Sequence, residues 1–66
     1  MDIIVNDAPV SLPDGANVAT LVVHLGLTGA RVAVEVNRTL VRRADHAACA
    51  LQPGDHVEVV TLVGGG

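Results

Sequence analysis

The residues most distinctive for possible chemistry in this sequence are three consecutive glycines, Gly64, Gly65 and Gly66. Glycine adds no side-chain packing and loses the most backbone entropy when it is ordered, so these residues do not stabilise a fold. A glycine segment can instead extend through a channel too narrow for side chains and present an unhindered carboxylate. Residues 63–66 span at most roughly 13 Å when extended, which is enough to reach a partner's active site. A frayed end without function has the same composition, so the glycines alone leave both interpretations open.

Other residue types capable of chemistry are sparse. Cys49 could act as a nucleophile or carry a persulfide, but it lies in the apolar segment 47–51 with no fixed base nearby, which favours a small core residue. The sequence contains three histidines: His24, His46 and His56. Their spacing does not match that of zinc ligands. The consecutive Arg42 and Arg43 could contact a partner's carboxylate or lie solvated on a loop. We therefore expect no catalytic residue, no metal and no cofactor.

Composition limits the classes of protein that this chain can represent. Its 66 residues allow one small domain, and with 50% apolar residues and no aromatic side chain the core must be aliphatic. A single cysteine cannot form an internal disulfide. The net charge of −3, with no lysine and no aromatic residue for base stacking, argues against nucleic-acid binding. No apolar run approaches the roughly 18 residues of a membrane span, so we expect a cytoplasmic protein that works through protein partners.

Residue patterns in the first half of the chain predict a β-hairpin followed by a short helix. Residues 1–6 and 8–12 read as two strands, and the turn formers Asn6-Asp7 lie between them. Asn17 occupies the N-cap position of a helix, and Gly26 provides its C-terminal stop. The apolar residues of this helix fall at i, i+3, i+4 and i+7, namely Val18, Leu21, Val22 and Leu25. A helix of about two turns is too short to stand alone, so this stripe must dock on a sheet.

The second half of the chain adds further strands. Residues 31–37 alternate between apolar and polar side chains, and residues 40–41 can form a brief extended piece. Residues 44–51 are alanine-rich and suggest a helical turn followed by a short strand. The last strand covers residues 56–63. This element order predicts an α+β domain of the β-grasp (ubiquitin-like) type, with a mixed sheet of four to five strands packed on one short helix.

We expect a domain that covers residues 1–63 and a flexible tail that covers residues 64–66. One face of the predicted sheet has no covering layer. When the odd-numbered residues of the last strand face the helix, Val60 and Leu62 face the uncovered side, and Ile4 of the first strand does so too. Apolar residues near the tail predict a docking surface. Its members are Ile4, Val60, Leu62 and Val63. Scattered exposed apolar residues without function are the alternative.

The sequence resembles the sulfur-carrier proteins of thiazole (thiamine) biosynthesis, a ubiquitin-like family. The resemblance runs nearly end to end and is most specific in Val32–Asn37, Val41–Arg43 and Pro53–Val60, which leads into the glycines. In this family the middle stretch usually reads Val-Pro-Arg and is followed by an aromatic residue. Here Arg42 replaces the proline and His46 stands near the aromatic position, so the resemblance does not extend to the local loop geometry, whereas it does extend to the tail.

The resemblance implies a reaction sequence in which the chain is a substrate. A ubiquitin-activating-type adenylyltransferase would use ATP to convert the Gly66 carboxylate to an acyl-adenylate. Sulfur from a persulfide donor would then displace AMP and leave a thiocarboxylate. Thiazole synthase would accept that sulfur, while Gly64 and Gly65 extend into the partner's active site. On this interpretation the chain is not an enzyme.

Other functions are compatible with parts of the same pattern. A carrier for molybdopterin synthesis is usually longer and rich in aromatic residues, whereas a carrier for cysteine synthesis is harder to separate from sequence. A ubiquitin-like interaction module with an inert tail would share the fold. A very small enzyme would use Cys49 as its nucleophile.

Overall fold

A five-stranded mixed sheet forms the frame of the protein in the computed structural model, which describes residues 1–62. In chain order the strands are β1 (Asp2–Val5), β2 (Ala8–Ser11), β3 (Val32–Val36), β4 (Thr39–Val41) and β5 (His56–Thr61). The helical segments are α1 (Val18–His24) and the 3-10 helix η1 (Arg43–Ala48). Across the sheet the strands follow the order β2-β1-β5-β3-β4. The central strand is therefore β5, which runs parallel to β1 and antiparallel to β3.

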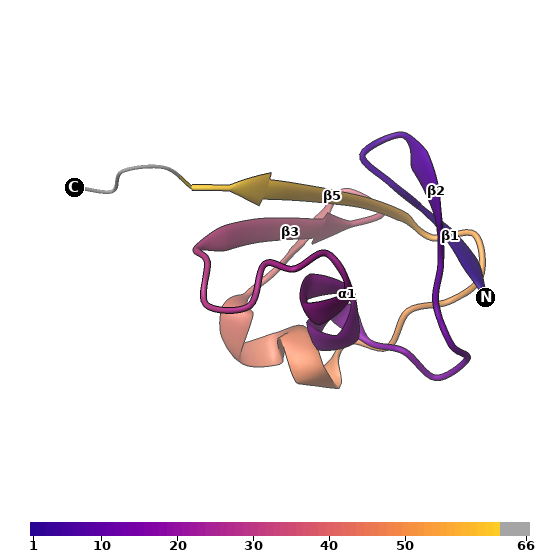
Figure 1. Ribbon diagram of the computed structural model, residues 1–66, viewed down its shortest axis with the longest axis horizontal. Helices are drawn as coiled ribbons and strands as arrows, with labels where there is room; N and C mark the ends of the chain where they lie inside the picture. The colour runs from indigo at the N-terminus through magenta and orange to yellow at the C-terminus, as the bar shows by residue number, and fades with distance from the viewer. Residues whose placement is uncertain (63–66) are drawn as a thin grey trace.

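Both helical segments lie on one side of the sheet, and the opposite face has no covering layer among the described residues (Figure 1). The predicted β-grasp fold, with a mixed sheet on one short helix, is confirmed. Residues 44–51 differ from the expectation because the helical part starts one residue earlier, at Arg43, and the expected short strand is only an isolated bridge between Ala50 and Asn17. Neither helical segment in the described chain is long and apolar enough to span a membrane.

Both β-hairpins turn through two residues in the left-handed region. Asn6 and Asp7 have φ values of 49° and 67°, and Asn37 and Arg38 have values of 49° and 71°. Two-residue turns of this kind match the twist of the flanking strands, and asparagine tolerates positive φ better than most residues. The first hairpin is thus predictable from its Asn-Asp pair. The second hairpin has Arg38 at the position where glycine is usual, so its sequence does not predict a tight turn.

Helix α1 is capped at both ends. The Oδ1 of Asn17 accepts a hydrogen bond from the Thr20 amide (2.8 Å), and the Thr20 hydroxyl accepts one from the Asn17 amide (3.2 Å). This reciprocal pair is a capping box. At the other end Gly26 adopts a φ of 72°, and the Leu27 amide reaches back to the Val22 carbonyl (3.0 Å). Both boundaries agree with the predicted N-cap and stop, and they fix the helix although it has only seven residues.

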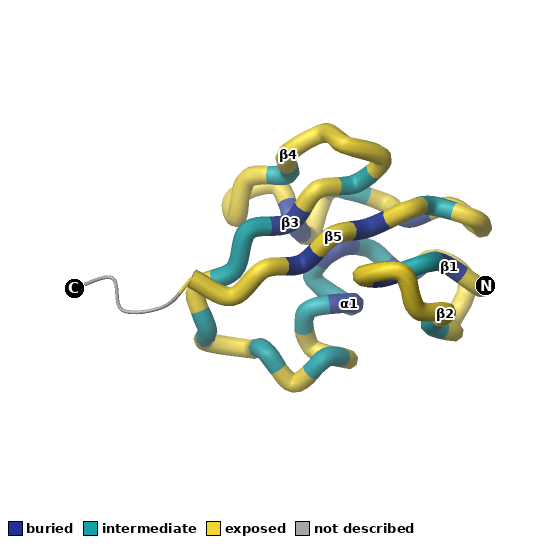
Figure 2. The backbone as a smooth tube through the Cα atoms, turned by 90° about the horizontal axis from the view of Figure 1, so that it is seen from above, coloured by how far each residue is buried: buried dark blue, intermediate teal, exposed yellow. Residues whose placement is uncertain are grey.

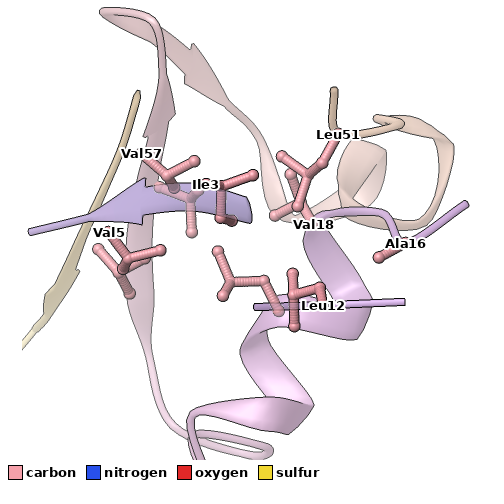
Figure 3. Close-up of a cluster of buried hydrophobic side chains, with 10 residues drawn as sticks. Ile3, Val5, Leu12, Ala16, Val18, Leu51 and Val57 are labelled. Carbon is pink, nitrogen blue, oxygen red and sulfur yellow. The ribbon is translucent and has the colours of Figure 1, made fainter. Parts of the chain in front are cut away.

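The core between the sheet and α1 is entirely aliphatic (Figure 3). Its buried members are Ile3, Val5, Leu12, Ala16, Val18, Leu21, Val34, Leu51, Val57 and Val59. Full burial of a valine, leucine or isoleucine side chain contributes about 1.5–3 kcal/mol. In β5 the core residues alternate with exposed ones, as Figure 2 shows along the strand. This alternation places the even-numbered side chains of β5 on the open face.

Candidate functional site

The end of β5 is the point from which the glycine segment departs. The last described residue, Leu62, is held to the sheet by its amide, which donates to the Arg31 carbonyl at 2.8 Å. Val63, Gly64, Gly65 and Gly66 lie outside the described residues, as does the predicted boundary between domain and tail. The end of β5 lies at the opposite side of the molecule from the N-terminus (Figure 1).

Asn6 secures β5 just before this point, a role that the sequence does not reveal. Its side-chain Nδ2 donates to the Val59 carbonyl (3.0 Å), and its Oδ1 accepts from the Val59 amide (2.9 Å). The side-chain amide therefore pairs with β5 as a further residue of β1 would. After Val59, β5 and Leu62 are paired within the described chain on one side only, by β3 and by Arg31, the residue that precedes β3.

We expect Asn6→Ala to destabilise the protein by about 1–3 kcal/mol, because both backbone groups of the nearly buried Val59 would lose their partner. Asp7→Ala is the matched control, since Asp7 occupies the same turn at positive φ but makes no side-chain hydrogen bond to β5. Urea denaturation followed by circular dichroism measures both variants. Equal loss of stability in the two would show that backbone strain, and not the Val59 bonds, accounts for the effect.

The open face carries large apolar side chains near the end of β5. Val60 is 56% exposed and Leu62 is 49% exposed. Leu40 is 61% exposed, but it lies on the edge strand β4, which β3 separates from β5, at the level of Glu58. Val60 and Leu62 therefore lie as the alternation predicts. Their use as a docking surface remains a prediction.

The expected position of Ile4 near the tail is wrong. Ile4 is half-buried and pairs with His56 at the beginning of β5, four residues before Val60. Four residues of strand correspond to roughly 13 Å, so Ile4 belongs to a different part of the sheet. The error arose because alternation assigns a residue to a face but says nothing about its position along the neighbouring strand. Register supplies that position, and it depends on pairing that the sequence does not specify.

The other candidate residues do not form a site together. Cys49 is half-buried and packs against the core, so it is less enclosed than expected. His46 is buried, and its Nε2 lies 3.2 Å from the Val41 carbonyl, whereas His24 and His56 are exposed. Within residues 1–62 no three side chains of the metal-binding types are grouped closely enough to hold a metal ion.

A shallow groove between α1 and η1 was not predicted. It has a volume of about 290 Å³ and continues along the loop of residues 27–30 to the start of β3. His46 contributes to its lining, as does Arg43, which is exposed. Asn17 connects its two helical walls by donating to the Ala47 carbonyl at 3.1 Å. The alanine-rich sequence of η1 is the signal for this feature, because small side chains leave space between helices.

The comparison with protein families decides what kind of chain this is. The family model described as the ThiS family matches residues 3–66. The chain belongs to the ThiS family. The crystal structure of the thiamine biosynthesis protein ThiS from Geobacter metallireducens is similar over the whole of both chains, with a TM-score of 0.83 and 32% identity. The solution structure of a thiamine biosynthesis protein from the same organism has a TM-score of 0.81 and 32% identity, and the match covers all of this chain and 88% of that one.

Two longer curated proteins are also related to this ThiS-family chain. A thiazole synthase of Magnetococcus marinus is 38% identical over all 66 residues, and one of Paramagnetospirillum magneticum is 32% identical over the same length. The chain spans about a fifth (20%) of each of these relatives. The sequence resemblance to the family is thereby confirmed. The match includes position 42, where this chain has arginine in place of the family's usual proline.

Proposed function

We propose that this ThiS-family chain carries sulfur for thiazole formation in thiamine biosynthesis. Family membership and the similarity to a thiamine biosynthesis protein support the pathway. Two proteins named thiazole synthase contain a stretch similar to the whole chain, which supports thiazole synthase as the acceptor of the sulfur. The observation that carries the proposal is the family match, which extends through Gly64, Gly65 and Gly66 and so includes the glycine segment after β5.

The proposed chemistry takes place at the Gly66 carboxylate. One carboxylate oxygen attacks the α-phosphorus of ATP on a ubiquitin-activating-type adenylyltransferase, and pyrophosphate leaves. The terminal sulfur of a persulfide donor then attacks the acyl carbon, and AMP leaves with the electron pair of the broken C–O bond. A second thiol attacks the other sulfur of the resulting acyl disulfide, which gives a disulfide and the Gly66 thiocarboxylate. A carboxylate is a poor acyl donor, so adenylation supplies the leaving group that sulfur transfer requires.

In this scheme the chain contributes reach and recognition, and the partner enzymes contribute the catalytic groups. The domain of residues 1–63 would be recognised on its open face, and residues 64–66 would form the tail that enters the active site. The chain is then a substrate and not an enzyme. Because the reaction uses ATP and free thiols, we place it in the cytoplasm.

Pyrophosphate exchange tests the first step. The purified adenylyltransferase of the same organism's thiazole pathway is incubated with ATP, labelled pyrophosphate and the chain. We expect incorporation of label into ATP that depends on the chain and saturates with its concentration. Exchange no greater than that of the adenylyltransferase alone would contradict the proposal and favour an interaction module without sulfur chemistry.

The docking surface gives a second prediction. Val60→Asp or Leu62→Asp should raise the Kd for the adenylyltransferase by at least about tenfold, because a carboxylate would be desolvated in an apolar contact. Folding should be largely preserved because both side chains are about half exposed. Val23→Asp is the matched control: Val23 is 64% exposed but lies on α1, on the covered side of the sheet. Titration calorimetry with a melting curve for each variant provides the comparison. An equal Kd in all three variants would rule out the open face as the contact.

A further inference from the structure

Arg31 lies beside the end of β5, and Arg42 and Arg43 follow the edge strand β4 on the same half of the sheet. We propose that these three residues, called here the arginine collar, bind an acidic rim on the adenylyltransferase and guide the tail into its site. The inference rests on the proposed function and adds the chemistry of the partner surface. It follows from where the arginines lie, from their lack of carboxylate partners and from the position of the acidic residues.

The collar is assembled by the sheet from two distant parts of the sequence. Arg31 lies beside the last described residue of the chain, because its carbonyl accepts the Leu62 amide at 2.8 Å. Arg42 follows directly after β4, whose final residue Val41 pairs with Val34 of β3. Arg43 begins η1 and lines the groove on the helix side. One positive charge therefore lies beside the last described residue of β5's extension, and two lie where β4 leads into η1 on the same half of the sheet.

None of these guanidinium groups is engaged within the described chain. All three residues are exposed, and no carboxylate of residues 1–62 lies within 4.0 Å of any arginine, since the ion pair of that part of the chain joins the Met1 amino group to Asp14. Arginine forms planar, bidentate hydrogen bonds with carboxylates and is weakly hydrated, so unpaired exposed arginines are suited to a partner's acidic side chains.

The acidic residues lie mostly elsewhere, although the chain has a net charge of −3. Asp2 and Asp14 are next to the N-terminus and Asp55 is next to the start of β5, all three far from the end of that strand. Three further carboxylates line a polar hollow with Arg38 and His56 in the middle and at the far end of the sheet: Asp7, Glu35 and Glu58. The remaining carboxylate, that of Asp45, lies on η1, two residues after Arg43. The described part of the molecule is therefore polarised, with Arg31, Arg42 and Arg43 toward the end of β5 and most carboxylates toward its start.

This polarity favours an acidic partner surface over a basic one. A cluster of like charges raises the association rate with an oppositely charged site by about 10- to 1,000-fold, and salt suppresses the effect. An acidic rim would attract the collar and repel the acidic end, so the tail would arrive first. The carrier would thereby be oriented before the apolar contacts of Val60 and Leu62 form.

Association kinetics test the collar with a charge-matched control. Arg31→Glu, Arg42→Glu and Arg43→Glu each change the net charge by two units, and so does Arg38→Glu at the far turn between β3 and β4. Binding of each chain to the immobilised adenylyltransferase is recorded from about 50 mM to 1 M salt. We expect each collar variant to associate about three- to tenfold more slowly at low salt, and Arg38→Glu to remain within about twofold of the parent. At high salt the differences should disappear.

Pyrophosphate exchange, measured on the same samples, separates this proposal from the proposed function. Slower association of the collar variants, together with normal pyrophosphate exchange at a saturating concentration of the chain, supports both the collar and the carrier function. Slower association without exchange in the parent would support the collar and contradict the carrier function. Equal association rates at low salt for the collar variants and Arg38→Glu, or faster association of the collar variants, would overturn the proposed role of the collar, whatever the pyrophosphate exchange shows. A parent chain that does not bind would overturn it too.

Discussion

Removal of Gly66 should abolish adenylation while leaving the folded domain unchanged. The deletion shortens the reach of the tail by roughly 3.5 Å, and catalysis tolerates a displacement of reacting atoms of only about 1 Å before it loses about 100-fold in rate. Gly65→Val should have a similar effect for another reason. Its branched side chain would occupy a channel that admits bare backbone, and it would exclude any conformation at positive φ. Pyrophosphate exchange at saturating adenylyltransferase measures both.

A melting curve is the control for these two variants. Neither change touches the core, so the free energy of unfolding should remain within about 0.5 kcal/mol of the parent. A chain that lacks both Gly65 and Gly66 and still supports normal exchange would contradict the role of the tail. The ubiquitin-like interaction module would then become the better interpretation.

Leu21→Ala should remove much of the stability of the domain. Leu21 is fully buried between α1 and the sheet, and truncation of such a leucine costs about 2–5 kcal/mol. At about 0.05–0.15 kcal/mol per residue, a domain of 66 residues has a total stability of roughly 3–10 kcal/mol. The melting temperature should therefore fall by more than about 10 °C.

Leu40→Ala is the matched control for this core variant. The same atoms are removed from a side chain that is 61% exposed, so the change should stay within about 0.5 kcal/mol. Urea denaturation followed by circular dichroism measures both proteins. Equal midpoints would show that α1 is not packed against the sheet as described.

Local patterns predicted the elements of the fold because several independent signals agreed. Asn17 and Gly26 mark the ends of α1, and the cap hydrogen bonds at both ends join residues no more than five positions apart. The alternation in β5 placed Val57 and Val59 in the core and Val60 on the open face. Such signals act within a few residues, so they can be read without knowledge of the tertiary structure.

Features that depend on register or on distant contacts could not be read in this way. Alternation places Ile4 on the correct face but at the wrong end of it, since its pairing with His56 spans most of the chain. The hydrogen bonds from Asn6 to Val59 and the approach of Arg31 to the end of β5 have the same origin. The sequence presents His46 as a candidate metal ligand with unsuitable spacing and as a departure from an aromatic residue, whereas the structure gives it a buried position and a contact with the Val41 carbonyl.

The central claim is that Gly66 carries sulfur, and the intact mass of the chain tests it most directly. The chain is incubated with the adenylyltransferase, ATP, a persulfide donor and a thiol, and then analysed by mass spectrometry with fragmentation. The account predicts a mass gain equal to the exchange of one oxygen for one sulfur, located on Gly66 and dependent on ATP. An unchanged mass under conditions in which the enzyme activates another ThiS-family carrier, or sulfur located on Cys49, would contradict it.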